Sequence, residues 1–193
     1  MDQNIILIIF YSYVLGSIPF GLILTKFFLK KDLREMGSGN IGATNVLRTG
    51  KKSLAIATLI LDILKGFGVI VLTNEFFPQF TYFSGLICFI GHIFPVWLKF
   101  SGGKGVATYL GIILAISLKL GIVFGISWLI ISYLTRYSSL ASILSSLNVF
   151  FFALYSHEIN PDFIYLTFFV IIIFTHRENL IRLKNGSEHK IKF

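Results

Sequence analysis

Residues 106–134 read VATYLGIILAISLKLGIVFGISWLIISYL, an apolar stretch that is interrupted only by Lys119. A membrane helix needs about 20 apolar residues to cross about 30 Å of hydrocarbon. The stretch therefore forms either one long, tilted span or two short spans that turn at residues 119–121. This choice decides the fold, because it sets the parity of the spans and the side of the membrane on which the C-terminus lies.

The composition of the whole chain indicates a membrane protein. Of its 193 residues, 55% are hydrophobic, 21 are Phe, and only 13% are charged. A soluble domain carries about 25% charged residues, and a soluble surface cannot be built from half that number. The composition excludes an ordinary soluble enzyme and also excludes intrinsic disorder.

Five further apolar runs flank the central stretch, and no internal repeat or linker separates them. We therefore predict an all-α, polytopic helix bundle that forms a single membrane-embedded domain over residues 1–193. The runs cover residues 5–28, 53–73, 80–98, 140–155 and 163–175. Nothing at the N-terminus resembles the basic start of a signal peptide.

The distribution of basic residues favours two spans within 106–134. With two, the bundle has about seven spans, and 15 of the 17 Lys and Arg residues lie on one side. The positive-inside rule then places the N-terminus outside and the C-terminus inside. A single span would instead put the basic tail, residues 177–192, on the outside. The net charge of +8 would suggest nucleic acid in a soluble protein, but here it indicates topology and anionic ligands, so we expect no nucleic-acid partner.

The first polar motif, residues 37–48, reads GSGNIGATNVLR and follows the first apolar run. Its glycines permit tight turns and close approach to a ligand, and freed backbone N–H groups can point at an anion. A flexible loop between spans is the alternative. The literal match of residues 37–42 to the dinucleotide fingerprint fails, because no strand precedes it. The expected substrate contacts are Ser38, Gly39, Asn40, Ile41, Gly42, Ala43, Thr44, Asn45 and Arg48.

The second motif, residues 101–105, reads SGGKG and precedes the central apolar stretch. The complete phosphate-loop pattern is absent. Glycine amides before a helix still make an anion site, so we expect Gly102 and Gly103 to bind an anion together with the charge of Lys104. Taken alone, a loop with an interfacial lysine explains this motif equally well.

The third motif, residues 176–183, reads HRENLIRL and begins where the last apolar run ends. His176 and Asn179 have i, i+3 spacing and can share a helix face. Glu178 and Arg182 have i, i+4 spacing and are expected to pair as a structural contact. A membrane-surface anchor would explain Arg177 and Arg182 but not the His and the Asn. Under the seven-span topology, all three motifs reach the same side, where Arg48, Lys104, Arg177 and Arg182 suit ligands that carry phosphate.

Polar residues inside the apolar runs have weaker claims to function. Asp62 and Lys65 lie in the second run at i, i+3, and charges at that depth are costly and often functional; here they are expected to be structural, neutralising each other or meeting His92. Ser142 belongs to a serine stripe, Ser139, Ser142 and Ser145, and is a candidate ligand contact. Cys88 is the only cysteine, so an internal disulfide is impossible. The few acids and scattered histidines argue against a metal, and no cofactor is expected.

Residues 157–162, HEINPD, match H-x-x-x-x-D, the signature of another class of glycerolipid acyltransferase. Seven spans put this segment outside, away from the other motifs, and Pro161 interrupts its geometry. We interpret it as a turn.

The ordered set of the three motifs resembles the bacterial acyl-phosphate:glycerol-3-phosphate acyltransferases, from Gly37 to Leu183. The resemblance implies transfer of a fatty acyl group from acyl phosphate to the 1-hydroxyl of glycerol 3-phosphate, giving lysophosphatidic acid and phosphate. It also implies that the acceptor phosphate binds at the second motif. The residues it marks as catalytic are Ser38, Arg48, His176 and Asn179, and those it marks as binding the acceptor phosphate are Gly102, Gly103 and Lys104.

The resemblance implies a multi-pass protein of the bacterial cytoplasmic membrane with its active site on the cytoplasmic face. Its expected partners are acyl phosphate, glycerol 3-phosphate, membrane lipid and the soluble enzyme that makes acyl phosphate. The proton of the attacking hydroxyl could go to His176, through Ser38, or to a substrate phosphate. Two other functions stay open: a transporter of a phosphate-bearing solute, which would use broken helices near the midplane, and an acyl-CoA-dependent acyltransferase that uses His157 and Asp162.

Overall fold

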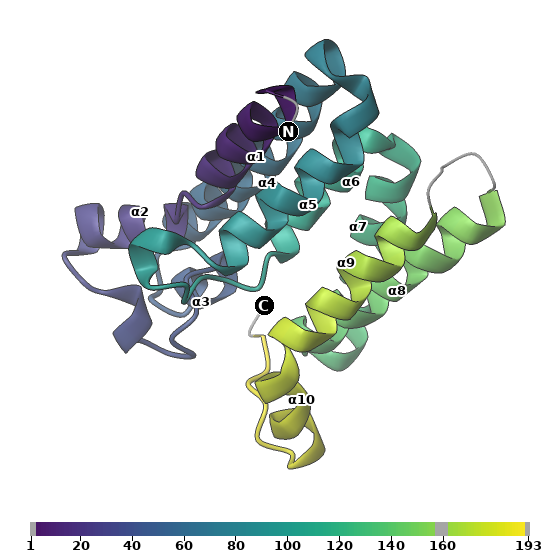
Figure 1. The fold of residues 1–193 in the computed structure, drawn as a ribbon. Coiled ribbons are helices and arrows are strands. Elements are labelled where there is room, and N and C mark those ends of the chain that lie inside the picture. Colours follow the sequence, from purple (N-terminus) through teal and green to yellow (C-terminus); the bar gives the residue numbers. More distant parts are fainter. Residues whose placement is uncertain (1–2, 157–161, 192–193) are drawn as a thin grey trace. The chain divides into compact units, whose positions relative to one another are not determined.

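The computed structural model describes residues 3–156 and 162–191. Over this part of the chain, the secondary structure is helical and contains no strand, which confirms the predicted all-α class (Figure 1). The chain divides into two compact units, Met1–Ala115 and Ile116–Phe193. Each unit is described separately.

The first unit contains most of the polar motifs. In it, α5 packs against both α1 and α4, and α4 also contacts α2 and α3. The α-helices are α1 (Gln3–Gly16), α2 (Phe20–Leu29), α3 (Ala43–Leu47), α4 (Lys52–Phe76), α5 (Thr81–Ile93) and α6 (Val106–Ile116), whose last residue falls in the second unit. Three short 3-10 helices accompany them, namely η1 (Leu33–Glu35), η2 (Pro78–Phe80) and η3 (Val96–Leu98).

The second unit is built around one helix. α8 (Ser138–Ser156) packs against α7 (Leu118–Thr135) on one side and α9 (Asp162–Thr175) on another. The chain then bends by 60° into α10 (Arg177–Lys184). This bend falls at His176, the first residue of the third motif.

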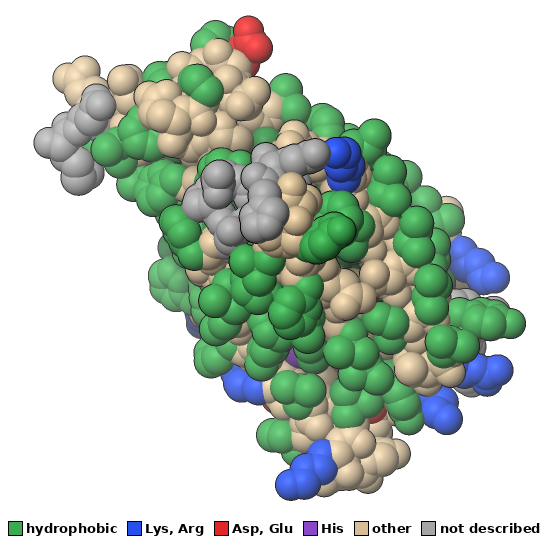
Figure 2. All heavy atoms as spheres, turned by 90° about the vertical axis from the view of Figure 1, so that its right-hand side faces the viewer, with side chains coloured by type: hydrophobic (Ala, Val, Ile, Leu, Met, Phe, Trp, Pro, Cys, Tyr) green, Lys and Arg blue, Asp and Glu red, His purple; other side chains and the backbone are tan. Residues whose placement is uncertain are grey.

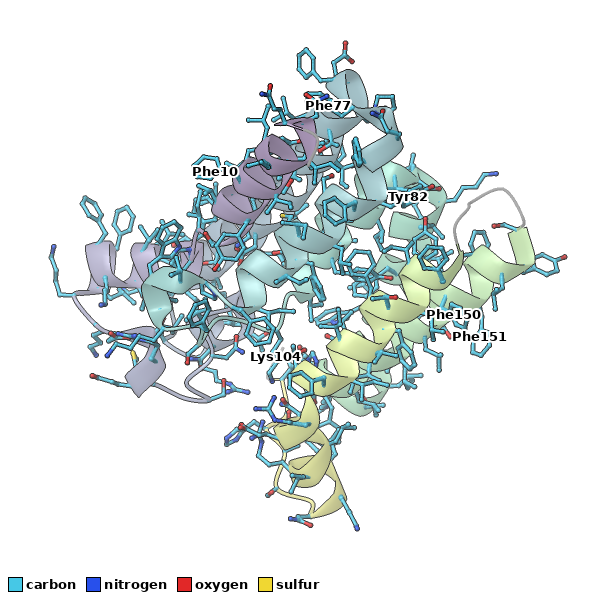
Figure 3. All side chains as sticks on the ribbon, in the orientation of Figure 1. Phe10, Phe77, Tyr82, Lys104, Phe150 and Phe151 are labelled. Carbon is cyan, nitrogen blue, oxygen red and sulfur yellow. The ribbon has the colours of Figure 1, made fainter. Side chains whose placement is uncertain are left out.

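Among the described residues, five helical stretches are long and apolar enough to cross a membrane, and the bent pair α9–α10 would make a sixth. The five are Gln3–Leu29, Lys52–Phe76, Pro78–Leu98, Leu118–Thr135 and Ser138–Ser156. Hydrophobic side chains are spread over the face that Figure 2 displays, with few charged side chains among them. Figure 3 shows Phe10 on α1 and Phe151 on α8 pointing away from their helices, and their exposed fractions are 66% and 57%. Such exposed aromatic residues suit contact with lipid, and the chain is a multi-pass membrane protein.

The central stretch forms two helices, as predicted, but they meet at Ser117 instead of residues 119–121. Ser117 is extended (φ −155°, ψ 120°), and its carbonyl accepts the Gly121 N–H at 3.2 Å at the start of α7. α6 has 11 residues, which is about 16 Å of helix and shorter than the hydrocarbon core. The number of seven spans and the orientation of the termini stay predictions.

α4 and α6 approach each other closely because glycines line their contact. A Cβ at Gly66 would collide with the Thr108 carbonyl, and a Cβ at Gly111 would collide with the Ile63 carbonyl. Small residues allow this close packing of membrane helices. The contact brings Thr108, at the start of α6, next to the buried charges of α4.

Candidate functional site

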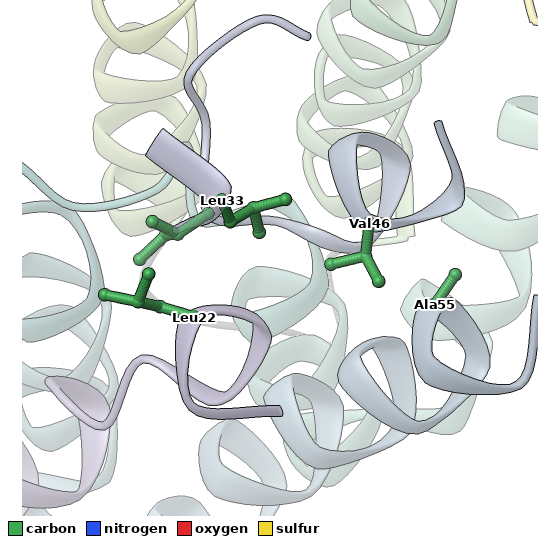
Figure 4. Packing of buried hydrophobic residues seen from close by; sticks show 5 residues of the cluster. Leu22, Leu33, Val46 and Ala55 are labelled. Atoms are coloured by element: carbon green, nitrogen blue, oxygen red, sulfur yellow. The ribbon is translucent and has the colours of Figure 1, made fainter. Parts of the chain in front are cut away.

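The segment between α2 and α4 has a hydrophobic core of its own. Leu33, Ile41 and Val46 are at most 3% exposed and pack with Leu22 of α2 and Ala55 of α4 (Figure 4). This packing excludes the alternative of a flexible loop. The Ile41 side chain belongs to this core, so a substrate contact at this position, which stays a prediction, would use the backbone.

Asn45 holds the first motif together from inside. Its Nδ2 lies 3.1 Å from the Leu33 carbonyl, 2.9 Å from that of Met36 and 2.8 Å from that of Asn40. Its Oδ1 accepts the Ser38 N–H at 3.0 Å, and the residue is 2% exposed. The side chain of Asn45 is therefore engaged by the loop itself, and its contact with a substrate stays a prediction.

Glycines and short hydrogen bonds set the remaining shape of this loop. Gly37 and Gly39 have positive φ (54° and 71°), and a Cβ at Gly37 would collide with Asn45 Oδ1. The Gly39 N–H donates to Met36 (2.9 Å), and the Gly42 N–H donates to Asn40 Oδ1 (2.8 Å). The amides of Ser38, Gly39 and Gly42 are thus engaged, so an anion would rely on the other loop amides and on side chains. The exposed side chains of the motif are Ser38, Thr44 and Arg48.

An ion cluster anchors the N-terminal edge of the same loop. Arg34 contacts both carboxylate oxygens of Asp32 (3.0 and 2.7 Å), and Lys26 of α2 lies 3.2 Å from Asp32. The hydrogen bonds from Arg34 hold the pKa of Asp32 well below its usual range. Both basic residues of this cluster, Arg34 and Lys26, are paired with Asp32, so not every cation near the loop is available to a substrate.

The second motif is tied to the end of α5 through its backbone. The Gly102 N–H donates to the Ile93 carbonyl (3.0 Å), and the Gly103 N–H donates to the His92 carbonyl (3.1 Å). In this conformation, the two amides predicted to bind an anion are already paired with protein. Lys104 follows them, half-buried, and Figure 3 labels it in the segment before α6. Anion binding by Gly102, Gly103 and Lys104 stays a prediction, and in this conformation it would depend on the Lys104 side chain more than on the two amides.

The charges expected within the second apolar run form a buried cluster. Lys65 Nζ lies 2.7 Å from Asp62 Oδ1 and 2.8 Å from His92 Nδ1, and Asp62 Oδ1 lies 3.8 Å from His92 Nδ1. Both expected contacts, between the two charges and with His92, are confirmed. The cluster lies where α5 meets the second motif.

In the second unit, His176 is 2% exposed and is oriented by the helix that precedes it. Its Nδ1 lies 2.8 Å from the Ile172 carbonyl. Because a carbonyl only accepts, Nδ1 carries the proton, and Nε2 is the proton acceptor of the neutral ring. His176 thus has the tautomer that a general base needs.

Glu188 is a shared hydrogen-bond acceptor for other polar groups in and near the third motif. It accepts hydrogen bonds from Asn179 Nδ2 (2.6 Å), Ser139 Oγ (2.9 Å) and Arg182 Nε (2.8 Å). Burial raises the pKa of this carboxyl, but the hydrogen bonds from Asn179, Arg182 and Ser139 outweigh burial and bring the pKa below its ordinary value. Glu188 was not predicted from the sequence, in which it is one of two acids in the basic tail of residues 177–192.

The remaining predicted residues of this unit make looser contacts. Glu178 and Arg182 pair as expected, at 3.9 Å. The exposed Arg177 donates to the Phe174 carbonyl (3.2 Å) and lies over the Phe174 ring. Ser142 donates to the Ser138 carbonyl (2.8 Å) and accepts from Trp128 Nε1 (3.2 Å), so its hydroxyl joins α7 to α8. Its role as a ligand contact stays a prediction.

The H-x-x-x-x-D segment cannot be placed, because residues 157–161 and the side chain of Asp162 lie outside the described residues. Within residues 3–156 and 162–191, no three His, Cys, Asp or Glu side chains are grouped so that they could hold a metal ion.

Comparison with known proteins assigns the chain to a family. A family model described as glycerol-3-phosphate acyltransferase matches residues 6–186. The chain is 52% identical to a glycerol-3-phosphate acyltransferase of Pelagibacter ubique over 181 residues, which cover 94% of each chain. It is 44% identical to that of Mesorhizobium japonicum over 191 residues, covering 99% of this chain and 98% of the relative.

Solved structures give the same result. The chain resembles the crystal structure of PlsY (YgiH), an integral membrane glycerol 3-phosphate acyltransferase, in its glycerol 3-phosphate form, with a TM-score of 0.93 and 38% identity over 98% of this chain and 96% of the other. The lysophosphatidic acid form of the same enzyme gives a TM-score of 0.90 and 37% identity over the same shares. By sequence and by structure, the chain belongs to the glycerol-3-phosphate acyltransferase family.

Proposed function

We propose that this protein transfers a fatty acyl group from acyl phosphate to the 1-hydroxyl of glycerol 3-phosphate, and that the products are lysophosphatidic acid and inorganic phosphate. The observation that carries the proposal is the likeness to PlsY, whose two crystal forms contain the acceptor and the acylated product. Acyl phosphate as the donor is supported by the resemblance of the three motifs.

The reaction balances without a cofactor. The oxygen at C1 of glycerol 3-phosphate attacks the acyl carbon and forms the ester bond. The bond between the acyl carbon and the phosphate oxygen breaks, and phosphate leaves with its electron pair. The hydroxyl proton passes to a base, for which we propose Nε2 of His176, because the Ile172 carbonyl holds the proton of the neutral ring on Nδ1.

The main difficulty of this reaction is electrostatic, since both substrates are anions. We propose that Arg48 and Lys104 of the first unit, and Arg177 of the second unit, offset the repulsion. Arg182 binds Glu188, so we assign it mainly to holding Asn179 and the tail in place. Ser38, exposed in the first motif, is proposed to contact a substrate, and most of the rate gain then comes from positioning.

We propose that both compact units belong to one acyltransferase domain over residues 1–193. Its seven spans would place the catalytic motifs at the cytoplasmic face of the bacterial cytoplasmic membrane, since the basic residues gather beside them in the sequence. There the protein can receive acyl phosphate from the soluble enzyme that makes it, and its product stays in the lipid.

A donor comparison tests the proposal. Purified protein in lipid vesicles is given glycerol 3-phosphate with acyl phosphate, acyl-CoA or acyl carrier protein, and lysophosphatidic acid is measured. We expect lysophosphatidic acid with acyl phosphate as the donor and none with acyl-CoA or acyl carrier protein. Product from acyl-CoA but not from acyl phosphate would favour the second acyltransferase class, whereas uptake of glycerol 3-phosphate into vesicles without product would favour a transporter.

Intact-mass measurement after mixing with acyl phosphate alone tests direct transfer. The expected mass is that of the unmodified chain. An added acyl group that is lost in Ser38→Ala but kept in Ser53→Ala, a second exposed serine of the first unit, would overturn direct transfer in favour of an acyl-serine intermediate.

A further inference from the structure

We propose that His92 is a positioning residue for the second motif, and that Lys65 and Asp62 fix its imidazole in one orientation and one tautomer. The inference rests on the proposed acyl transfer, since it concerns the loop expected to bind the phosphate of glycerol 3-phosphate. It assigns a task to three polar side chains that the proposed reaction does not use.

The first step is the coordination of Lys65 inside the first unit. Its ammonium contacts Asp62 Oδ1 (2.7 Å), the Ile18 carbonyl (2.8 Å) and His92 Nδ1 (2.8 Å). Lys65 is 7% exposed, Asp62 2% and His92 5%. An ammonium has three N–H donors, and here three acceptors surround it. Charges buried at this depth are costly unless they are paired, and in membrane helices they usually serve a function.

The second step is the tautomer of His92. Lysine only donates, so Nδ1 of His92 accepts from Lys65, and the proton of the neutral ring lies on Nε2. The hydroxyl of Thr108 on α6 also lies 3.2 Å from Nδ1. Residues of α4 and α6 therefore hold the Nδ1 edge of the ring, and this fixes the direction of the opposite edge, which carries Nε2.

The third step is the contact between that other edge and the second motif. A Cβ at Gly103 would collide with His92 Nε2 and would lie 3.0 and 3.1 Å from the neighbouring ring carbons. A Cβ at Gly102 would collide with the His92 carbonyl. The same carbonyl accepts the Gly103 N–H, and the next carbonyl, of Ile93, accepts the Gly102 N–H.

These contacts explain why two glycines precede Lys104. His92 fills the space in which side chains at positions 102 and 103 would lie, and it binds the backbone there. The backbone position of Lys104 is consequently set by His92, although His92 needs no contact with the substrate. Displacing a binding group by about 1 Å can cost about 10² in rate, so the orientation of this ring matters for the acceptor.

Steady-state kinetics of the full-length protein with both substrates separate positioning from general stability. His92→Phe keeps a ring under Gly103 but loses the bond to Lys65. We expect the KM for glycerol 3-phosphate to rise by about tenfold, as is typical when a residue that orients a binding group is removed, while the KM for acyl phosphate stays within about twofold. Cys88→Ala is the control, because Cys88 is buried on the same helix one turn away.

Two paired variants test the part played by Lys65 and Asp62. Asp62→Asn with Lys65→Gln removes both charges but keeps an N–H donor for His92 Nδ1, and its KM for glycerol 3-phosphate should stay within about threefold of wild type. Asp62→Leu with Lys65→Leu removes the charges and the donor, and should behave like His92→Phe. Equal KM values for the two pairs, or equal rises in KM for both substrates with His92→Phe, would overturn the inference.

Hydrogen exchange of residues 101–105 gives a readout that needs no activity. The amides of this loop should exchange faster in His92→Phe and in the double Leu variant than in wild type or Cys88→Ala. Unchanged exchange and unchanged KM would reject the role of His92 while leaving the acyltransferase proposal intact. Failure of the wild type to form lysophosphatidic acid would reject that proposal, and the exchange rates would still decide the role of His92.

Discussion

At the scale of single residues, buried polar side chains near the motifs bind protein groups first. Asn45 bonds to three loop carbonyls, His92 supports two glycines, and Glu188 collects Asn179 and Arg182. Buried polar groups need such partners. The sequence could not separate Asn45 from a ligand contact, because an asparagine in a glycine-rich loop looks the same in either role. The sequence identified His176 as a candidate base, whereas its tautomer follows from the contact between its Nδ1 and the Ile172 carbonyl, which only the structure shows.

The first prediction at this scale concerns the proton acceptor. His176→Gln should lower kcat by about 10² or more, because it removes the proposed general base. His189→Gln, which changes an exposed histidine of the tail, should leave kcat unchanged. A near-normal kcat for His176→Gln in single-turnover measurements would show that the proton goes to a substrate phosphate oxygen.

The second prediction concerns Glu188 and pH. Its pKa is lower in the folded protein than the ordinary value of 4.5, so its stabilising contribution is complete above that pH and is lost as the pH falls through the lower folded pKa. The Tm of the wild type should therefore drop below about pH 4.5 more than that of Glu188→Gln, which is already less stable at pH 7.

Thermal unfolding in detergent between pH 7 and pH 3 measures this difference. Glu178→Gln is the control, since the Glu178 side chain is 74% exposed, and it should follow the wild-type profile. Identical pH profiles for wild type and Glu188→Gln would contradict a stabilising role for the ionised carboxylate.

At the scale of elements, the apolar runs predicted every long helix but not their breaks. The runs show which residues avoid water, and this is enough to find helices in a membrane. α6 and α7 are separated by one extended residue, Ser117, and the chain bends by 60° between α9 and α10. A hydropathy pattern records neither of these, since both arise from backbone geometry and tertiary contact.

The third prediction concerns the packing of the second motif against His92 at the end of α5. Gly103→Ala introduces a Cβ that collides with His92, so we expect a lower Tm and a strong loss of acyl transfer. Gly68→Ala on α4 meets nothing within 4 Å, and it should keep activity and at least the wild-type Tm, because alanine favours a helix by about 1 kcal/mol over glycine. Wild-type kinetics for Gly103→Ala would contradict the described packing of the loop.

At the scale of the whole molecule, the sparse charges carry the strongest sequence signal. They predicted a multi-pass membrane protein, and the structure and the relatives support that class. The cluster of Asp62, Lys65 and His92 was only partly foreseen, because residues 27 positions apart come together through tertiary packing. No role was predicted for Glu188, since an acid among basic residues does not reveal its hydrogen-bond partners.

The fourth prediction concerns topology and uses the basic residues themselves. In a Cys88→Ala background, Lys119→Cys should react with a membrane-impermeant maleimide from outside the cell. Lys184→Cys should react only after the membrane is opened, because seven spans leave the C-terminus inside. Labelling of both positions from the same side would contradict two spans within residues 106–134.

The most direct test of the central claim is the stoichiometry of the reaction in purified protein. With acyl phosphate and glycerol 3-phosphate as the only substrates, the account predicts one inorganic phosphate released for each lysophosphatidic acid formed, and loss of both signals in His176→Gln. Phosphate release without lysophosphatidic acid, or no reaction of acyl phosphate at all, would contradict it.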